Sequence, residues 1–199
     1  MPLALLSIPR HLGYLVLGAL VGAEASGVPV PGETALIAAS VLASDGDLSI
    51  EAVIAIAAVA AIVGDNIGYL LGTRFGRRLL TRPGRTYDHR MAALRRGDEL
   101  FDRHGAKAVF FGRWIAGLRV WAAWLAGMTT MPWRKFLLWN ALGGIGWALW
   151  FGLLGYFGGE AAAHVVARVG LGVAIAAGSA ALAVFVAVRW RLRRRARRY

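Results

Sequence analysis

Five ionisable side chains lie inside apolar stretches of this 199-residue sequence. They are three carboxylates and two arginines: Glu24, Glu33, Asp65, Arg113 and Arg119. A charge at the centre of a bilayer costs at least about 2.5–3.5 kcal/mol on insertion scales, so such residues usually pair or belong to a substrate or ion pathway. They could form a working site or a static salt-bridge network. Because a half-satisfied buried network is costly and five groups are many for a clamp, we favour a working site.

The apolar residues form long blocks, which indicates a membrane protein. The sequence is 58% hydrophobic and has a mean hydropathy of +0.56. About 20 apolar residues are needed to cross a bilayer, and three stretches meet this length: Ala52–Gly72, Phe136–Gly158 and Val169–Val188. A further apolar run follows Arg10. The sequence therefore predicts an all-α polytopic membrane protein, with about four membrane-spanning helices in a single domain over residues 1–188.

The charged residues are distributed unevenly, and this predicts the topology. Of a formal net charge of +12, most comes from segment 73–107, from the polybasic tail 189–199 and from a small cluster at 134–135, whereas segment 45–51 is acidic. The positive-inside rule places the basic segments, including the C-terminus, in the cytoplasm and the acidic loop outside. The same distribution argues against nucleic acid as a partner, because topology and anionic lipid explain it.

Two apolar segments must then enter the membrane and return to the face that they left. The first run is expected to cross outward from Arg10 to Gly22, so that segment 24–44 begins and ends outside. Segment 108–130 begins and ends beside cytoplasmic basic residues. We therefore expect two re-entrant helical hairpins that enter from opposite faces, an inverted repeat of the kind found in secondary transporters.

Helix-breaking residues mark the turn of the first hairpin. Pro29 and Pro31 lie between two apolar runs, and proline disfavours a continuing helix. Gly27 and Gly32 allow the tight backbone of such a turn. Irregular backbone at membrane depth persists only where it is buried in protein or lines a wet cavity. This turn is therefore expected at a site near the midplane.

A ridge of glycines surrounds Asp65. Gly64, Gly68 and Gly72 recur every four residues, and Tyr69 lies one turn after Asp65. Small residues at this spacing let another helix approach closely in a membrane. We therefore expect a hairpin to pack tightly beside Asp65. The same spacing serves contacts between chains, which leaves a homo-oligomer open.

The tryptophans and the basic segment 82–105 are assigned structural roles. The tryptophans, Trp147 among them, are interpreted as interface and packing residues. Segment 82–105 is expected to form a cytoplasmic surface helix with a partial apolar face, which anchors the chain at the membrane surface.

These residues together resemble the signatures of the DedA family, also called the VTT or SNARE-associated membrane proteins. The first signature is matched by Glu24, Gly27, Pro29, Pro31, Gly32 and Glu33. The second is matched by Gly64, Asp65, Tyr69 and Gly72, and the third by Arg113, Arg119, Asn140 and Trp147, among others. The sequence departs from the family at Ala116–Gly117, where a proline is usual.

The resemblance implies lipid transport in the bacterial inner membrane, because bacterial members return undecaprenyl phosphate, the carrier lipid of wall synthesis, to the cytoplasmic leaflet. It implies an essential acidic pair, Glu24 and Glu33, an essential arginine pair, Arg113 and Arg119, and a further aspartate, Asp65. Arginine presents a planar fork of donors suited to phosphate. The arginines are thus expected to bind the phosphate and the carboxylates to handle protons, which would offset inward movement of negative charge against the membrane potential.

Other functions remain open. A nonspecific phospholipid scramblase would use the same hairpins without coupling, and a proton or cation antiporter for pH homeostasis would make the arginines structural. An enzyme is disfavoured, because the sequence shows no serine–histidine arrangement and no metal-ligand cluster among its four histidines, and it has no cysteine. No cofactor or metal is expected.

Overall fold

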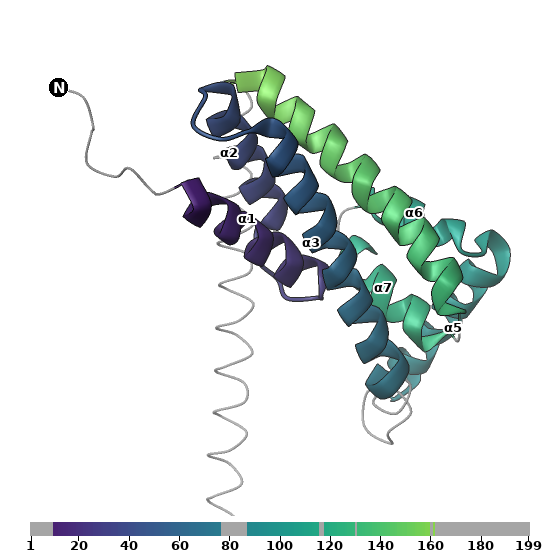
Figure 1. Ribbon diagram of the computed structural model, residues 1–199. Coiled ribbons are helices and arrows are strands. Elements are labelled where there is room, and N and C mark those ends of the chain that lie inside the picture. Colours follow the sequence, from purple (N-terminus) through teal and green to yellow (C-terminus); the bar gives the residue numbers. More distant parts are fainter. Residues whose placement is uncertain (1–9, 77–86, 116–117, 130, 160, 162–199) are drawn as a thin grey trace, which may run out of the picture.

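The protein is helical throughout the part that the structure describes (Figure 1). The computed structural model describes residues 10–76, 87–115, 118–129, 131–159 and 161. The all-α prediction is confirmed for these residues. The predicted span Val169–Val188 and the tail 189–199 lie outside them.

Two long helices form the frame of the fold. Helix α3 (Ile50–Leu71) continues through a π-helical turn, Gly72–Gly76, and the other long helix spans Trp133–Gly159. Each continuous stretch has 27 residues and is apolar enough to cross a membrane. At about 1.5 Å per residue, each is about 40 Å long. The predicted spans Ala52–Gly72 and Phe136–Gly158 lie within these helices.

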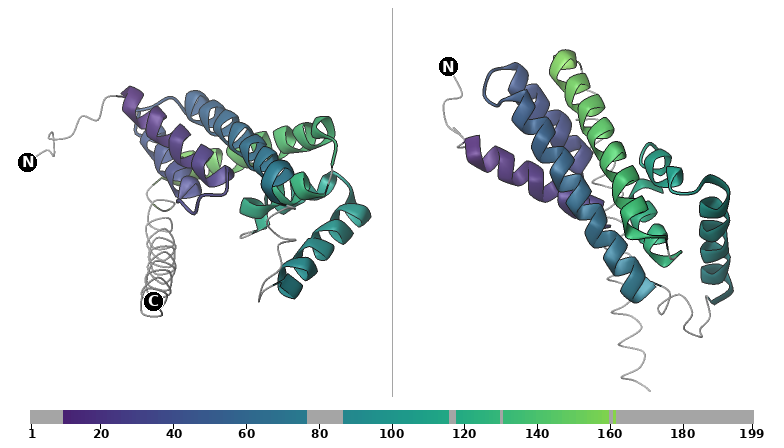
Figure 2. Two further views of the ribbon diagram at one scale, coloured as in Figure 1. Left: turned by 90° about the horizontal axis from the view of Figure 1, so that it is seen from below. Right: turned by 45° about the vertical axis from the view of Figure 1, so that its right-hand side comes forward.

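Glycines let the two long helices pack closely. Gly144 lies against the side chain of Ile62, and Gly152 lies against that of Ile54. Because later residues of one helix meet earlier residues of the other, the two helices are antiparallel (Figure 2).

The two ends of this frame carry opposite charge. Exposed acidic residues lie at and just before the start of α3: Asp45, Asp47 and Glu51. Exposed basic residues lie where α3 finishes and the other long helix begins: Arg74, Arg134 and Lys135.

A first helical hairpin, α1 (Arg10–Ala25) and α2 (Gly32–Ser44), packs along the first half of α3 (Figure 1). Its turn covers residues 26–31. Gly27 has a φ of 107° there, a left-handed conformation that glycine adopts without steric cost. Pro31 directly precedes α2. The chain therefore reverses at the residues that the sequence marks as helix breakers.

Both free ends of this hairpin lie near the start of α3. The backbone N–H of Ser49, just before α3, donates a hydrogen bond of 2.8 Å to the hydroxyl oxygen of Tyr14 in the first turns of α1. Further along, Gly22 lies against Ala60. Helix α1 therefore runs parallel to α3 toward its middle, and α2 returns.

This arrangement differs from the topology predicted for the N-terminal region. The sequence analysis expected a crossing from Arg10 to Gly22 and then a separate hairpin at 24–44, whereas α1 is itself the first arm of the hairpin. The physical reason lies in packing. Gly18 lies against Ile56 and Gly22 against Ala60, so the small residues of α1 seat it parallel to α3.

A second hairpin consists of α6 (Lys107–Gly112) and α7 (Leu118–Met128). Helix α7 packs along the other half of α3, whereas Phe110 of α6 lies against Gly143 of the last long helix. Gly127 near the end of α7 lies against the carbonyl oxygen of Tyr69. The arms of the second hairpin therefore start from the α3 end opposite to the first hairpin, as expected for segment 108–130. Ala116–Gly117 in its turn lies outside the described residues.

Helix α5 (Tyr87–His104) packs on the second hairpin, away from α1 and α2 (Figure 2). Phe101 is buried in the cluster formed with that hairpin, and Gly97 lies against Leu125 of α7. A helix thus occupies most of segment 82–105, and residues 82–86 lie outside the described part.

A side chain at Gly64 would collide with the first hairpin, because an added Cβ would meet the carbonyl oxygen of Gly22 and the Cβ of Ala25. We expect Gly64→Ala to lower the free energy of unfolding by about 1–3 kcal/mol, as overpacking does. Thermal unfolding of the purified protein in detergent measures this. Gly146→Ala is the control, since its added Cβ would have its nearest neighbour at 3.9 Å. Equal losses in both variants would contradict the tight contact.

Candidate functional site

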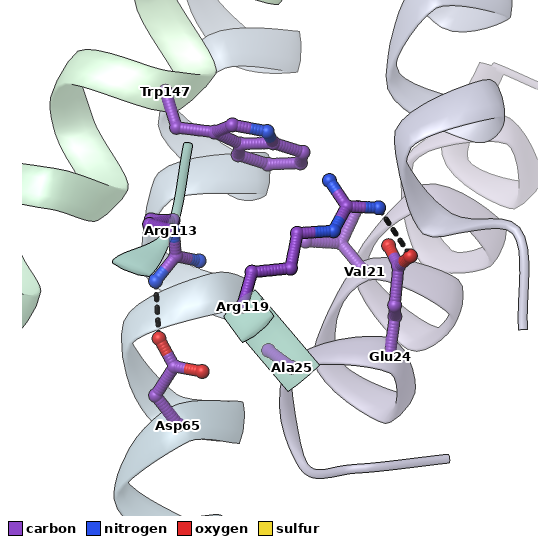
Figure 3. Close-up of a pocket in the computed structure, with 7 residues that line it drawn as sticks. All are labelled: Val21, Glu24, Ala25, Asp65, Arg113, Arg119 and Trp147. Carbon is purple, nitrogen blue, oxygen red and sulfur yellow. Dashed lines mark hydrogen bonds and ion pairs between the residues drawn. The ribbon is translucent and has the colours of Figure 1, made fainter. Parts of the chain in front are cut away.

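The turns of the two hairpins meet near the middle of α3, and charged side chains converge there (Figure 3). Glu24 lies near the end of α1, Glu33 in the first turn of α2, Asp65 in α3, Arg113 directly after α6 and Arg119 in the first turn of α7. All five ionisable residues that the sequence places in apolar stretches therefore lie in one region, in two ion-paired groups: Arg113 with Asp65, and Arg119 with Glu24 and Glu33.

Arg119 bridges the two hairpins. Its Nη2 pairs with Glu24 and its Nη1 with Glu33, so one guanidinium from α7 binds carboxylates from both arms of the first hairpin. The Glu33 side chain is 34% exposed, whereas that of Glu24 is 15% exposed. Glu33 is therefore the carboxylate of this group that is more accessible from outside the cluster.

Glu24 also caps helix α2. Its Oε2 accepts a hydrogen bond of 3.1 Å from the backbone N–H of Glu33, which satisfies one of the donors that a helix N-terminus leaves without an intrahelical partner. An added Cβ at Gly32 would lie 2.6 Å from this oxygen. Glycine is thus required at that position for the carboxylate to reach the helix terminus.

Arg113 is held by the two long helices rather than by the first hairpin. Its Nη1 pairs with Asp65 of α3 and donates a hydrogen bond of 3.1 Å to Oδ1 of Asn140. The Asn140 amide nitrogen in turn donates to the carbonyl oxygen of Ile62 at 3.2 Å. Asn140 and Asp65 are both buried. This network fixes Arg113 at the level of Asp65.

Trp147 covers both arginines. Its indole ring lies 5.5 Å from the guanidinium carbon of Arg113 and 5.7 Å from that of Arg119, both within cation–π range (Figure 3). Trp147 is only 3% exposed. Among the described residues, its indole Nε1 and the Nε of Arg113 are buried side-chain nitrogens without a hydrogen-bond partner.

A small pocket lies between these groups. It is lined by Val21, Glu24, Ala25, Asp65, Arg113, Arg119 and Trp147. Its volume of about 20 Å³ is enough for about one water molecule. The pocket is therefore too small for a phosphate headgroup in this structure, and both arginines are engaged by carboxylates.

Other contacts hold the hairpin turns in place. The Trp124 indole N–H of α7 donates to the carbonyl oxygen of Ser26 in the first turn at 2.9 Å. The Tyr69 hydroxyl donates to the Met131 carbonyl oxygen, and its ring stacks on Phe136 with centroids 4.6 Å apart. These contacts tie the turn of the first hairpin to α7 and tie α3 to the second long helix.

The glycine ridge beside Asp65 contacts both hairpins. Gly64 faces α1, whereas Gly68 and Gly72 face Trp124 of α7. The sequence predicted one hairpin packed tightly beside Asp65, and the structure has a hairpin arm on each side of it, α1 and α7.

Sequence reasoning missed Trp147, which it treated as a packing residue. The signal was available in the spacing, because Asn140, Gly143 and Trp147 recur at intervals of three and four and share one face of a helix. Gly143 lies against the Arg113 side chain. In the part of the chain that is described, no group of three or more His, Asp or Glu side chains is arranged to hold a metal ion.

Comparison with known proteins gives the chain its family. Residues 30–157 match the family model described as the VTT domain. An uncharacterized membrane protein of Mycobacterium tuberculosis is 44% identical over 179 residues, which cover 86% of this chain and 82% of the relative. Protein DedA of Escherichia coli is 33% identical over 132 residues, which cover 65% of this chain and 60% of DedA.

The inner membrane protein YohD of Escherichia coli is 36% identical over 129 residues, covering 65% of each chain. No solved structure matches the chain. The family model covers more than half of the sequence, and it includes the second arm of the first hairpin, α3, the second hairpin and nearly all of the last long helix. The chain is therefore a membrane protein of the VTT-domain family, the DedA family.

Proposed function

We propose that this protein moves a lipid with a phosphate headgroup, foremost undecaprenyl phosphate, across the bacterial cytoplasmic membrane in a proton-linked manner. The observation that carries the proposal is the pair of arginines, Arg113 and Arg119, at one pocket where two hairpin turns meet. Guanidinium groups bind phosphate oxygens in a bidentate manner. A polyprenyl tail can remain in the bilayer, so only the headgroup requires a polar path.

The small volume of the pocket implies that the headgroup binds only after the turns separate. Its volume of about 20 Å³ leaves room for about one water. Arg119 is the ion-pair link between the hairpins. We infer that phosphate replaces the carboxylates on Arg119, and that this exchange accompanies opening of the site.

The charge of the cluster supports a role for protons. Two arginines and three carboxylates give a formal charge of +2 − 3 = −1 when all are ionised. A phosphate monoester carries about −1.5 to −2 charges at neutral pH. Such an anion is disfavoured at a site that is already negative, so binding should accompany uptake of protons by the carboxylates.

The membrane potential adds a second reason for proton coupling. Inward movement of the phosphate opposes an inside-negative potential by about 2.3 kcal/mol per charge per 100 mV. Protons that cross on Glu24, Glu33 or Asp65 would reduce the negative charge moved. A pH gradient could then drive the lipid inward.

We expect the purified protein to bind undecaprenyl phosphate in preference to phosphatidylglycerol, and Arg113→Ala or Arg119→Ala to lose this preference. Each substitution removes charge-assisted hydrogen bonds of about 1.5–3 kcal/mol, which corresponds to about a tenfold loss of affinity or more. Native mass spectrometry with both lipids in competition measures the preference.

Arg134→Ala is the matched control for this experiment. Arg134 is exposed at the start of the last long helix, outside the pocket, and its loss should leave the preference intact. If both lipids bind equally and the pocket arginines are dispensable, a scramblase or an antiporter becomes the better interpretation.

A charge exchange separates a transport site from a static clamp. Asp65→Ala alone should lower the free energy of unfolding by about 3–5 kcal/mol, because it leaves Arg113 buried without its partner. The double variant Asp65→Arg with Arg113→Asp should recover much of this stability but not lipid transport, since the phosphate ligand has moved. Thermal unfolding and transport into vesicles measure the two effects. Recovery of both would identify the pair as a clamp.

Proton coupling predicts that transport in reconstituted vesicles depends on an imposed pH gradient. We expect a protonophore to slow inward movement of undecaprenyl phosphate several-fold, because the carboxylates then lack a driving force for net proton movement. Glu33→Gln removes one negative charge from the accessible side of the cluster and should weaken the dependence on the gradient. Transport at equal rates with and without a gradient would refute the coupling but not lipid movement itself.

A further inference from the structure

The buried indole N–H of Trp147 is an unused hydrogen-bond donor at the pocket. Trp147 is 3% exposed, lines the pocket, and has no acceptor for Nε1 among the described residues. Buried polar groups are nearly always paired, and an unpaired donor retains the cost of leaving water. At a pocket, such a donor is available to an acceptor oxygen of a ligand or of water.

A second buried donor without a partner belongs to another residue that lines the pocket. The Nε of Arg113 is also buried without a partner, although Nη1 of the same guanidinium binds Asp65 and Asn140. The indole ring of Trp147 extends over both guanidinium groups (Figure 3). The nearby carboxylates pair with the Nη atoms of the two arginines. The Nε–H of Arg113 and the indole N–H of Trp147 are therefore available to another acceptor.

We propose that Trp147 is a ligand-binding residue of this site, whose indole N–H donates to an oxygen of a bound phosphate group beside the Nε–H of Arg113. The proposal rests on the proposed function and extends it. Arg119, released from its carboxylates, would bind a further oxygen. The ring of Trp147 keeps the two guanidinium groups in place through cation–π contact.

This arrangement makes Trp147 a specificity-determining residue. A phosphate monoester has three terminal oxygens that can accept hydrogen bonds, one for each of Trp147, Arg113 and Arg119. A phosphodiester headgroup, such as that of phosphatidylglycerol, has only two. The third donor therefore favours monoesters, and the preference does not depend on charge alone because the indole is neutral.

The test uses Trp147→Phe, which keeps an aromatic ring over the arginines but removes the N–H. A closer variant replaces Trp147 by its benzothienyl analogue, in which sulfur takes the place of N–H. Trp150→Phe on the same helix is the control, since Trp150 is 58% exposed and lies outside the pocket. The full-length protein is titrated with undecaprenyl phosphate, with phosphatidylglycerol as competitor, and with inorganic phosphate followed by ³¹P NMR.

We expect both Trp147 variants to bind undecaprenyl phosphate about ten- to a hundredfold more weakly, the loss expected for one hydrogen bond to a charged group. Binding of phosphatidylglycerol and the behaviour of Trp150→Phe should change little. Unchanged affinity for undecaprenyl phosphate in both Trp147 variants, with loss in Arg113→Ala, would overturn this role of Trp147 and leave the proposed function intact.

The inorganic phosphate arm separates the two proposals. If the wild-type protein shows no preference for undecaprenyl phosphate but binds inorganic phosphate in a manner that requires the Trp147 N–H, the phosphate site stands and the lipid substrate is wrong. If inorganic phosphate and the lipid both bind without regard to this N–H, water alone satisfies the indole and the inference fails.

Discussion

The bridge from Arg119 to Glu24 and Glu33 is the interaction on which the closed arrangement depends. One arm of each hairpin, α1 and α7, is packed on α3 by glycine contacts that do not involve this bridge. Buried ion pairs add little net stability, because desolvation offsets their attraction. The bridge and the hydrogen bond from Trp124 to Ser26 hold the first turn against α7, while the glycine contacts set where α1 and α7 lie. Opening of the site, as the proposed function requires, would break the bridge and leave these glycine contacts in place.

The two arginines have different mechanical roles. Arg113 is held by Asp65 and Asn140, which belong to the two long helices of the frame. Arg119 is held by the opposing hairpin. Separation of the turns would release Arg119 from its partners and leave Arg113 in place. Trp147 is also part of the frame, so in the proposed cycle its half of the site would stay preformed while the Arg119 half would form again around the ligand.

The sequence predicted which segments form the site better than it predicted their directions and their contacts with one another. Long apolar blocks identify α3 and the last long helix, and prolines beside Gly27 identify the first turn, because these signals are local. The direction of α1 was wrong because Arg10 alone placed its start, and one charge is a weak guide to topology. The helical spacing of Asn140, Gly143 and Trp147 could have placed Trp147 on the site face, whereas its unpaired indole N–H becomes visible only when its neighbours are in place. The position of the site near the membrane midplane stays a prediction.

The opposite charges at the two ends of the frame make the two directions of passage unequal. One hairpin is entered beside Asp45, Asp47 and Glu51, and the other beside Arg74, Arg134 and Lys135. An anionic headgroup is depleted at the acidic end and concentrated at the basic end, over a distance of about one Debye length. These surface fields change occupancy and rates but do no net work over a complete cycle. If the proposed lipid is the substrate, its headgroup would therefore enter the site from the basic end more readily than from the acidic end.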